Sequence, residues 1–585
     1  MKTSAKTEIT LSKNYAAGED PVAEQAVDGT VTVVEIPWHF PANRIDWLFN
    51  PTSTNPPFNP EWTWQLNRMF FWNNLSEAYR KTGDEKYAEA FVVQLGDWLE
   101  QTGGMPAETG YNDVGSPWRT IEEGLRLLGS WSAAYRAFSV SPAFTTALRE
   151  RFVASMRAQA RHLMAHRTHK NWLLIEMTGV YSFAALFPDF PESGEMRKAS
   201  ARIFSDEIRQ QVLPDGMQYE LSPDYHYVFF SCAARLYRIA KANGYDRELP
   251  EDFLRVIERG AQVVLDMTTP AFIQPRFNDC FSIDAAKILS DAAEFFPNRQ
   301  DFLWGATRGD NGCAPEGLTA SRYLPYAGFA VMRSGWERDA TYLAFDIGPL
   351  GMGHFHQDKL GFTLWKGDEE LVFDDGGGAY EDSDFRRYAV SGYDHNTLLV
   401  DGLAQFRTGP HLVEGPIDAG WSSTAERDRV CGVYEDGFGP EQLRLARHER
   451  EIVFEKPGLF RITDNVVSLD GQAHDYELLF HVDSTTVSVS ADGRSAKVNY
   501  GRKWNLQITV REGGVISTDS AVLRPRISGW FIGRNDLVNH PATTISVKAP
   551  EKAFRQHFVT EMKITDGEEP RGRNTSRWRQ ERQAD

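Results

Sequence analysis

The hydrophobic pattern of this chain changes its period near residue 320, and that change constrains the fold most. Between about residues 61 and 303, apolar side chains recur every three or four positions, as in Leu66, Met69, Phe70 and Leu75. This spacing is typical of amphipathic helices. After about Arg322, apolar and polar residues alternate in short runs, which indicates strands with one buried face. The sequence therefore predicts a helical domain followed by packed antiparallel sheets.

The chain of 585 residues is too long for one hydrophobic core, so it should divide into domains. We expect an irregular lead-in at 1–60, a helical domain at 61–320 and a β-sandwich domain at 321–585. Within the helical part, the pattern predicts helices at 121–138, 143–165, 172–187, 195–212, 228–242 and 250–267. The clearest predicted strands lie at 326–333, 340–346, 370–373, 396–400, 448–454, 459–463, 477–482 and 505–510.

Charge and composition narrow the function classes. The net charge of −18 argues against a general nucleic-acid binder, although a locally basic groove would still accept an acidic polymer. One such basic run extends from Arg151 to Lys170. No apolar run approaches the length of a membrane span, so no membrane partner is expected. The sixteen tryptophans would fill helix cores or line a carbohydrate cleft.

The segment Gly353-His354-Phe355-His356 carries the strongest chemical signal. On a strand, both imidazoles would project from the same face, because side chains alternate with a period of two. A bulge or bend in the segment would instead let the two imidazoles serve two different sites. Together with Asp374 and His395, His356 would complete a zinc-type set of two nitrogens and one oxygen. Asp375 is an alternative oxygen ligand. Of the two, we choose Asp374. Non-haem iron would accept the same ligands, but nothing else in the sequence suggests an oxygenase.

Two further clusters lie in the helical half. In His169-Lys170-Asn171-Trp172-Leu-Leu-Ile-Glu176, the Asn171 amide could stabilise a carboxylate that gains charge, or it could simply cap a helix. The second cluster is Glu220-Leu-Ser-Pro-Asp-Tyr225-His226. A tyrosine beside cationic groups can act as base and acid, although tyrosines also serve as packing residues.

These motifs, taken together and in this order, resemble the heparinase II/III family of polysaccharide lyases, and most closely its heparinase III branch. The resemblance rests on Asn171 in His-Lys-Asn-Trp, Tyr225 in Glu-Leu-Ser-Pro-Asp-Tyr-His, and Gly-His354-Phe-His356 with Asp394-His395-Asn-Thr. The N-terminal motif Asn59-Pro-Glu-Trp-Thr-Trp-Gln-Leu-Asn-Arg68 adds to the similarity. The resemblance runs from about residue 40 to 490 and implies an incomplete (α/α) toroid joined to an antiparallel β-sandwich.

The resemblance also implies β-elimination at a uronic acid of a heparan-sulfate-like chain. Asn171 would neutralise the uronate carboxylate, Tyr225 would act as base, acid or both, and His354 would assist. The same resemblance places a structural metal, zinc or alternatively calcium, on His356, Asp374 and His395. Candidate substrate-binding residues are His169, Lys170, Glu176, Glu220, His226 and Tyr388.

Some features depart from this family or leave alternatives open. Its members are commonly periplasmic or secreted, but the N-terminus shows no apolar export segment, as in a cytoplasmic protein. The acidic net charge favours a weakly sulfated substrate or another uronate polymer such as alginate. A glycoside hydrolase would need two catalytic acids, for which Glu176, Glu220 and Asp224 are the candidates. A glycan-binding protein without activity is a third alternative.

Overall fold

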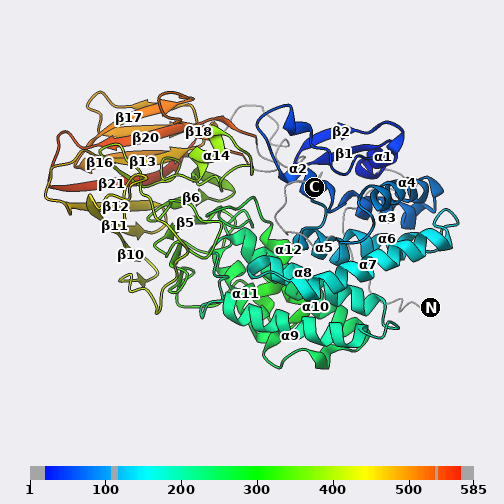
Figure 1. Ribbon diagram of the computed structural model, residues 1–585. Helices are drawn as coiled ribbons and strands as arrows, with labels where there is room; N and C mark the ends of the chain where they lie inside the picture. Colours follow the sequence, from blue (N-terminus) through cyan, green and yellow to red (C-terminus); the bar gives the residue numbers. More distant parts are fainter. Residues whose placement is uncertain (1–19, 107–115, 534–537, 568–585) are drawn as a thin grey trace.

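Helices build the first half of the described chain and antiparallel sheets build the second half (Figure 1). The structure is a computed structural model that describes residues 20–106, 116–533 and 538–567. Its main helices are α2 (Glu61–Leu66), α3 (Phe71–Thr82), α4 (Glu85–Gln101), α5 (Thr120–Leu128), α6 (Ser130–Phe138), α7 (Thr146–His166), α8 (Lys170–Leu186), α9 (Ser193–Gln211), α10 (Pro223–Asn243), α11 (Phe253–Met267), α12 (Ala285–Phe295) and α13 (Gln300–Ala306). The change of period predicts this change of secondary structure correctly.

Helix α8 is the central helix of the helical domain. All but two of its 17 residues are buried, as expected for a helix that is apolar on every side. It packs closely on α5, because Gly124 and Gly179 lie where the two backbones meet. A Cβ atom on Gly179 would come within 2.7 Å of the Gly124 carbonyl oxygen. This packing fixes the start of α8, where Asn171 lies.

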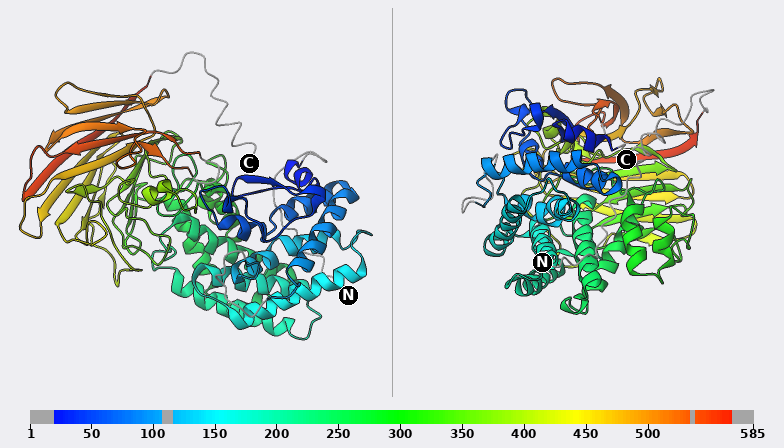
Figure 2. Two further views of the ribbon diagram at one scale, coloured as in Figure 1. Left: turned by 45° about the horizontal axis from the view of Figure 1, so that its top comes forward. Right: turned by 90° about the vertical axis from the view of Figure 1, so that its right-hand side faces the viewer.

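The second half forms three main antiparallel sheets (Figure 2). Five strands form the first sheet in the order β3 (Arg322–Leu324), β4 (Phe329–Arg333), β5 (Thr341–Asp346), β6 (Phe362–Lys366) and β7 (Glu369–Val372). Eight strands form the second, ordered β14 (Val487–Val489), β15 (Ser495–Asn499), β16 (Trp504–Glu512), β21 (Arg555–Asp566), β12 (Leu459–Ser468), β11 (Ala446–Glu455), β10 (Arg427–Tyr434) and β9 (Ser422–Ser423). The third contains β17 (Val515–Ser520), β20 (Thr543–Lys548), β13 (Tyr476–Val482) and β8 (Leu398–Val400).

The five-stranded sheet is the layer between the helices and the other sheets. Along β4, Phe329 and Val331 join a core cluster with Met267 and Phe277 of the helical domain. The alternate residues of the same strand, such as Met332, join the core of the sandwich. Because successive side chains of a strand point to opposite faces, both faces of this sheet are buried. Loops at the end of the sheet are thereby held at the domain junction.

Residues 20–60 contain more regular structure than the irregular lead-in expected from the sequence. They form α1 (Pro21–Val27) and a hairpin of β1 (Thr30–Val33) and β2 (Ile36–His39). Buried Ala23, Ala26 and Val31 belong to the helical core. Pro21 stands in the first turn of α1, and the Asn50 side chain caps the short helical turn Pro51–Ser53. Among the described helices, none combines the length and the apolar character needed to cross a membrane.

Candidate active site

The loop between β5 and β6 carries His354 and His356, and it is not a strand. The two imidazoles therefore do not share one face of a strand, and the segment bends as the alternative of two separate sites requires. His354 has a φ of +54°, in the left-handed region that residues other than glycine seldom adopt. Its carbonyl accepts a hydrogen bond from the Asp279 amide at 3.0 Å, which helps to hold this conformation. As a result, His354 contacts Glu220 while His356 contacts Asp279.

Glu220 joins two of the predicted catalytic residues. Its Oε1 accepts a hydrogen bond from Asn171 Nδ2 at 2.8 Å, and its Oε2 lies 2.5 Å from His354 Nδ1. Burial would raise the pKa of Glu220, but the contacts with His354, Asn171 and Gln218 outweigh it and lower the pKa. Glu220 is therefore ionised near neutral pH and accepts a hydrogen bond from His354 Nδ1, which leaves Nε2 of His354 for other partners.

Asn171 is not a helix cap. Helix α8 begins at Lys170, and His169 stands at the N-cap position without a capping hydrogen bond from its own side chain. The Lys170 amide donates instead to Glu207 Oε1 at 3.2 Å. The side chain of Asn171 instead reaches Glu220, and the residue is 5% exposed. Of the two interpretations left open by the sequence, the structure supports an amide directed into the site.

Tyr225 lies in the first turn of α10, where Ser222 caps the helix through a hydrogen bond from the Asp224 amide. Its ring stacks on His354, with 3.5 Å between ring centroids and 13° between the planes. The Tyr225 hydroxyl lies 2.9 Å from the hydroxyl of Tyr380. The three predicted catalytic residues, from three distant parts of the chain, therefore meet at the domain junction.

Several residues of this network were missed by the sequence reasoning. The Tyr380 hydroxyl donates to Asp279 at 3.0 Å, and Arg386 donates to both Asp279 oxygens at 2.6 and 3.1 Å. Contacts with His356 and Arg386 lower the pKa of Asp279 against the opposing effect of burial. Arg68, from the N-terminal motif, also interacts electrostatically with Tyr225. The proximity of Tyr380 and Arg386 to the glycine-rich turn is the only sequence signal that points to them.

The predicted metal ligands lie together in the buried core beside this network. His395 Nδ1 lies 2.9 Å from Asp374 Oδ2, and the His356 and His395 rings are 5.3 Å apart. One atom of each residue is buried without a hydrogen-bond partner, namely His356 Nδ1, His395 Nε2 and Asp374 Oδ1. Two nitrogens and a carboxylate oxygen are suitable zinc donors. Within the described ranges, however, no three or more His, Cys, Asp or Glu side chains are arranged so that they could hold a metal ion.

Asp375 differs from Asp374 in its partners. Its two oxygens accept hydrogen bonds from the Gly377 amide at 3.1 Å and the Ile532 amide at 3.0 Å. It therefore shapes the glycine-rich turn, whereas Asp374 keeps one oxygen atom available. This difference favours Asp374 as the ligand.

Three predicted substrate-binding residues lie near the start of α8 but have different surroundings. Glu176 is fully buried and accepts hydrogen bonds from the amide and hydroxyl of Thr168 at 2.8 and 2.6 Å. Lys170 donates to the Met352 carbonyl at 2.6 Å and so ties the helical domain to the His354 loop. His169 is exposed. Glu176 and Lys170 thus stabilise the site rather than face an open surface.

His226 and Tyr388 are not brought to the catalytic residues. His226 is 2% exposed, its Nε2 donates to the Gly260 carbonyl at 2.9 Å, and its Nδ1 accepts from the Gln218 amide. Burial lowers the pKa of His226 to about 4, so its ring is neutral. Tyr388 is buried in a small apolar cluster with Ile527 and Ile532. The prediction that these two side chains bind substrate is not supported by their positions.

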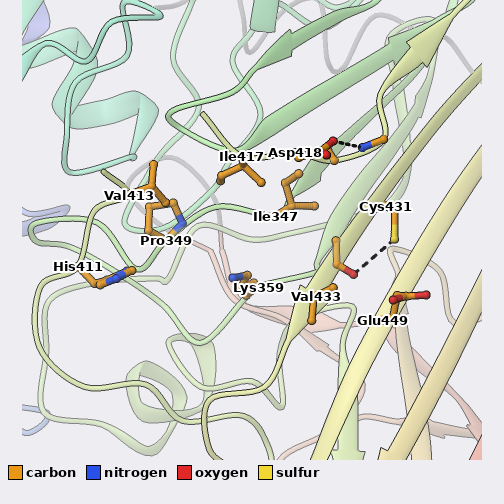
Figure 3. Close-up of a pocket in the computed structure, with 13 residues that line it drawn as sticks. Ile347, Pro349, Lys359, His411, Val413, Ile417, Asp418, Cys431, Val433 and Glu449 are labelled. Carbon is orange, nitrogen blue, oxygen red and sulfur yellow. Dashed lines mark hydrogen bonds between the residues drawn. The ribbon is translucent and has the colours of Figure 1, made fainter. Parts of the chain in front are cut away.

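The basic run before Asn171 is mainly a paired helix surface. Arg157 and Arg161 both bind Glu192, and His162 binds Glu123. A separate pocket of about 510 Å³ lies beside β10 and the loop before it, with Lys359 and His411 among its lining residues (Figure 3). None of the predicted site residues lines it.

Comparison with known proteins gives a consistent result over both halves. The model of the heparinase II/III N-terminus matches residues 2–304, and the model of the heparinase II/III-like C-terminal region matches residues 316–575. A heparin-sulfate lyase of Pedobacter heparinus is 30% identical over 365 residues, which cover 61% of this chain and 54% of that protein. A heparin-sulfate lyase of Bacteroides stercoris is 29% identical over 378 residues, which cover 61% of this chain and 56% of that protein. The alignments thus span about half the length of these relatives.

Solved structures extend the fold comparison over nearly the whole chain. A heparinase III structure superposes with a TM-score of 0.81 at 19% identity, covering 96% of this chain and 87% of that one. Another heparinase III structure superposes with a TM-score of 0.72 at 22% identity, covering 95% of this chain and 85% of that one. These likenesses confirm the predicted fold class, a helical toroid followed by an antiparallel β-sandwich. With both family models matched in order, the chain belongs to the heparinase II/III family.

Proposed function

We propose that this protein is a polysaccharide lyase that cleaves heparan-sulfate-like glycosaminoglycan at glucuronate by β-elimination. The product would carry a 4,5-unsaturated uronate at its new end. The observation that carries the proposal is that Glu220 binds both Asn171 and His354, while Tyr225 stacks on the His354 ring. The curated relatives are named heparin-sulfate lyases, which supports this substrate class.

The chemistry of β-elimination assigns a task to each of these groups. Removing the C5 proton places extra negative charge on the neighbouring carboxylate, and a preorganised amide donor such as Asn171 stabilises that charge. For glucuronate, the C5 proton and the leaving O4 are on the same side of the ring. Tyr225 alone could then accept the first proton and return a proton to O4. The free nitrogen of His354 would bind substrate or assist proton transfer.

A glycoside hydrolase on this scaffold is not favoured by the carboxyl groups at the site. A hydrolase needs one acid that is protonated and a second that is ionised, both facing the sugar. Both oxygens of Glu176 are occupied by Thr168, and those of Glu220 by Asn171, Gln218 and His354. The lowered pKa of Glu220 also opposes a role as general acid.

We also propose that His356, Asp374 and His395 hold a structural divalent ion, zinc or alternatively calcium. Their three buried atoms without partners fit this role. The ion would supply a fixed cross-link between the His354 loop, the glycine-rich turn and the start of β8. His356 also binds Asp279, so the same set would steady the hydrogen bonds that reach Tyr225.

A panel of uronate polymers tests the activity and its substrate. Heparan sulfate, heparin, hyaluronan and alginate would each be incubated with the protein, and ultraviolet absorbance of the unsaturated product would be followed. We expect the largest rate with heparan sulfate of low sulfation. A response to alginate alone would reassign the substrate, and binding without any product would indicate a glycan-binding protein.

A further inference from the structure

Tyr380 connects the Tyr225 hydroxyl to the buried carboxylate of Asp279. Its hydroxyl is 2.9 Å from that of Tyr225 and 3.0 Å from Asp279 Oδ2. The Arg386 guanidinium lies 4.8 Å from the centre of the Tyr380 ring. Tyr380 follows the glycine-rich turn of the sheet domain, whereas Tyr225 belongs to α10. The contact therefore crosses the domain junction at the catalytic tyrosine.

The hydrogen-bond partners of Asp279 allow the Tyr380 hydroxyl to change its direction of donation. Asp279 accepts from Arg386 through two nitrogens and contacts His356 at 3.0 Å. These contacts remain if Tyr380 turns its proton away from Asp279. A hydroxyl can donate one hydrogen bond and accept others, so Tyr380 can donate to either neighbour. A phenolate on Tyr225 would attract that proton strongly.

We propose that Tyr380 is a positioning residue that donates a hydrogen bond to the Tyr225 oxygen when that oxygen carries the negative charge of the general base. When Tyr225 is neutral, Tyr380 donates to Asp279 and accepts from Tyr225. No proton passes to Tyr380 in either state, and only the direction of the hydrogen bond changes. The inference rests on the proposed lyase function for its role in catalysis, but the hydrogen bond itself does not.

Several charged and titratable groups around Tyr225 also influence its titration, and the experiment must separate their effect from that of Tyr380. His354 stacks on its ring, and Glu220 stands behind His354. Arg68 acts on Tyr225 from the end of α2, while Asp279 and Arg386 act through Tyr380. Replacing Tyr380 by phenylalanine removes one hydroxyl and leaves all of these charges in place.

The direct test is the titration of Tyr225 without substrate. Carbon-13-labelled tyrosine would be followed by NMR from about pH 6 to about pH 11, and the Tyr225 signal assigned by its loss in Tyr225→Phe. In Tyr380→Phe, the midpoint should rise by about one pH unit, because the phenolate loses a charge-assisted hydrogen bond. Equal midpoints in the two proteins would overturn the proposal, whatever polymer is cleaved.

The kinetic test adds a second readout with a matched control. In Tyr380→Phe, we expect kcat to fall about tenfold, KM to stay within about twofold, and the acid limb of kcat/KM to move to higher pH. Tyr393→Phe removes another half-buried hydroxyl, which donates to the Gly402 carbonyl, and should leave all three unchanged. A fall in kcat without a shift of the acid limb would contradict the proposal. If no polymer is cleaved but the NMR midpoint shifts, the hydrogen bond stands and the proposed function fails.

Discussion

Glu220 shows how a single residue organises the site. One of its oxygens holds the Asn171 amide and the other holds the His354 ring. Such a buried carboxylate is costly unless several donors satisfy it. Here three side chains do so, and the result is a fixed tautomer for His354 and a fixed direction for Asn171. Glu220 therefore acts as a positioning group, although the sequence suggested a substrate contact.

The charge of Glu220 predicts a pH-dependent contribution to stability. A carboxyl group whose pKa is lowered by folding stabilises the folded state above its ordinary pKa near 4.5 and loses this effect as the pH falls. At pH 7, Glu220→Gln should lower the free energy of unfolding by about 1–3 kcal/mol. This difference from the wild type should shrink as the pH drops below about 4.5.

Chemical denaturation at several pH values measures this effect. Glu195→Gln, at an exposed position of α9, is the control and should leave the stability almost unchanged throughout. A difference for Glu220→Gln that stays constant down to pH values well below 4.5 would refute the assignment of an ionised Glu220.

At single positions, the sequence predicted more about chemistry than about geometry. Residue types with strong chemical preferences, such as Asn171, Tyr225 and His354, could be selected because few other roles suit them in those motifs. The partners of these residues could not, since Glu220 and Asp279 acquire their roles only through contacts across more than 45 residues. His226 and Tyr388 were misassigned because a polar residue beside a motif can equally turn into the core.

Among the secondary-structure elements, the five-stranded sheet positions the catalytic loop. Phe277 is fully buried in the cluster between this sheet and the helices, and its ring stacks on Phe329 at 5.2 Å. The next two residues act at the site. Asn278 holds the His356 amide, and the Asp279 amide holds the His354 carbonyl. Packing of one side chain is thus linked to the geometry of the loop.

Removing the Phe277 ring should disturb both stability and catalysis. Phe277→Ala should lower the free energy of unfolding by about 3–5 kcal/mol, as is usual for a buried aromatic residue. We also expect kcat of the folded protein to fall at least about tenfold, because small displacements of catalytic groups are costly. Denaturation curves and kcat measured on the folded fraction would check this.

Phe460→Ala is the matched control for that change. Phe460 is fully buried in the core of the sandwich and stacks on Phe454 at 4.2 Å. Phe460→Ala should lower the free energy of unfolding by a similar amount to Phe277→Ala and leave kcat near that of the wild type. Equal loss of kcat in the two variants would show that the junction has no special role.

The loops around His356, Asp374 and His395 lead to a prediction about metal. Protein purified without chelators should contain about one zinc or calcium ion per chain by elemental analysis. A chelator should lower the Tm by several degrees, since loss of a bound ligand destabilises the folded state. His395→Ala should contain no ion and show no response to the chelator.

His474→Ala is the control, because His474 is also buried and bound to carboxylates, Asp401 and Asp470, in another part of the sandwich. It should retain the ion. If the wild type binds neither zinc nor calcium after reconstitution and its Tm is unaffected, the proposed ligand set is wrong.

Helices and strands were the most predictable level of the structure. The predicted strand at 340–346 matches β5 (Thr341–Asp346), and the predicted helix at 143–165 matches α7 (Thr146–His166) within a few residues. Both elements were predictable from their apolar side chains, which recur about every 3.6 residues along the helix and form a short continuous run in the strand. The helix α1 and the hairpin of β1 and β2 were missed, because four-residue strands are too short to show a period. The sequence left a strand and a bend open at the His354 segment, because the left-handed residue there is not a glycine.

For the whole molecule, the central feature is a site divided between two domains. The helical domain provides Asn171 and Tyr225 from helices and Glu220 and Asp279 from the segments between them, while the sheet domain provides His354, Tyr380 and Arg386. Each domain could be recognised from its own pattern, but the pairing of their residues depends on how the five-stranded sheet packs on α11 and the following loop. Neither domain alone contains the full set of predicted catalytic groups.

The most direct test measures two products of one reaction on heparan sulfate. New chain ends and ultraviolet absorbance of the unsaturated uronate would be followed together for the wild type and for Tyr225→Phe. We predict that the wild type forms one unsaturated end for each bond broken, and that Tyr225→Phe loses at least about a hundredfold in kcat. New chain ends without unsaturation, or a Tyr225→Phe variant that keeps most of its rate, would contradict β-elimination at this site.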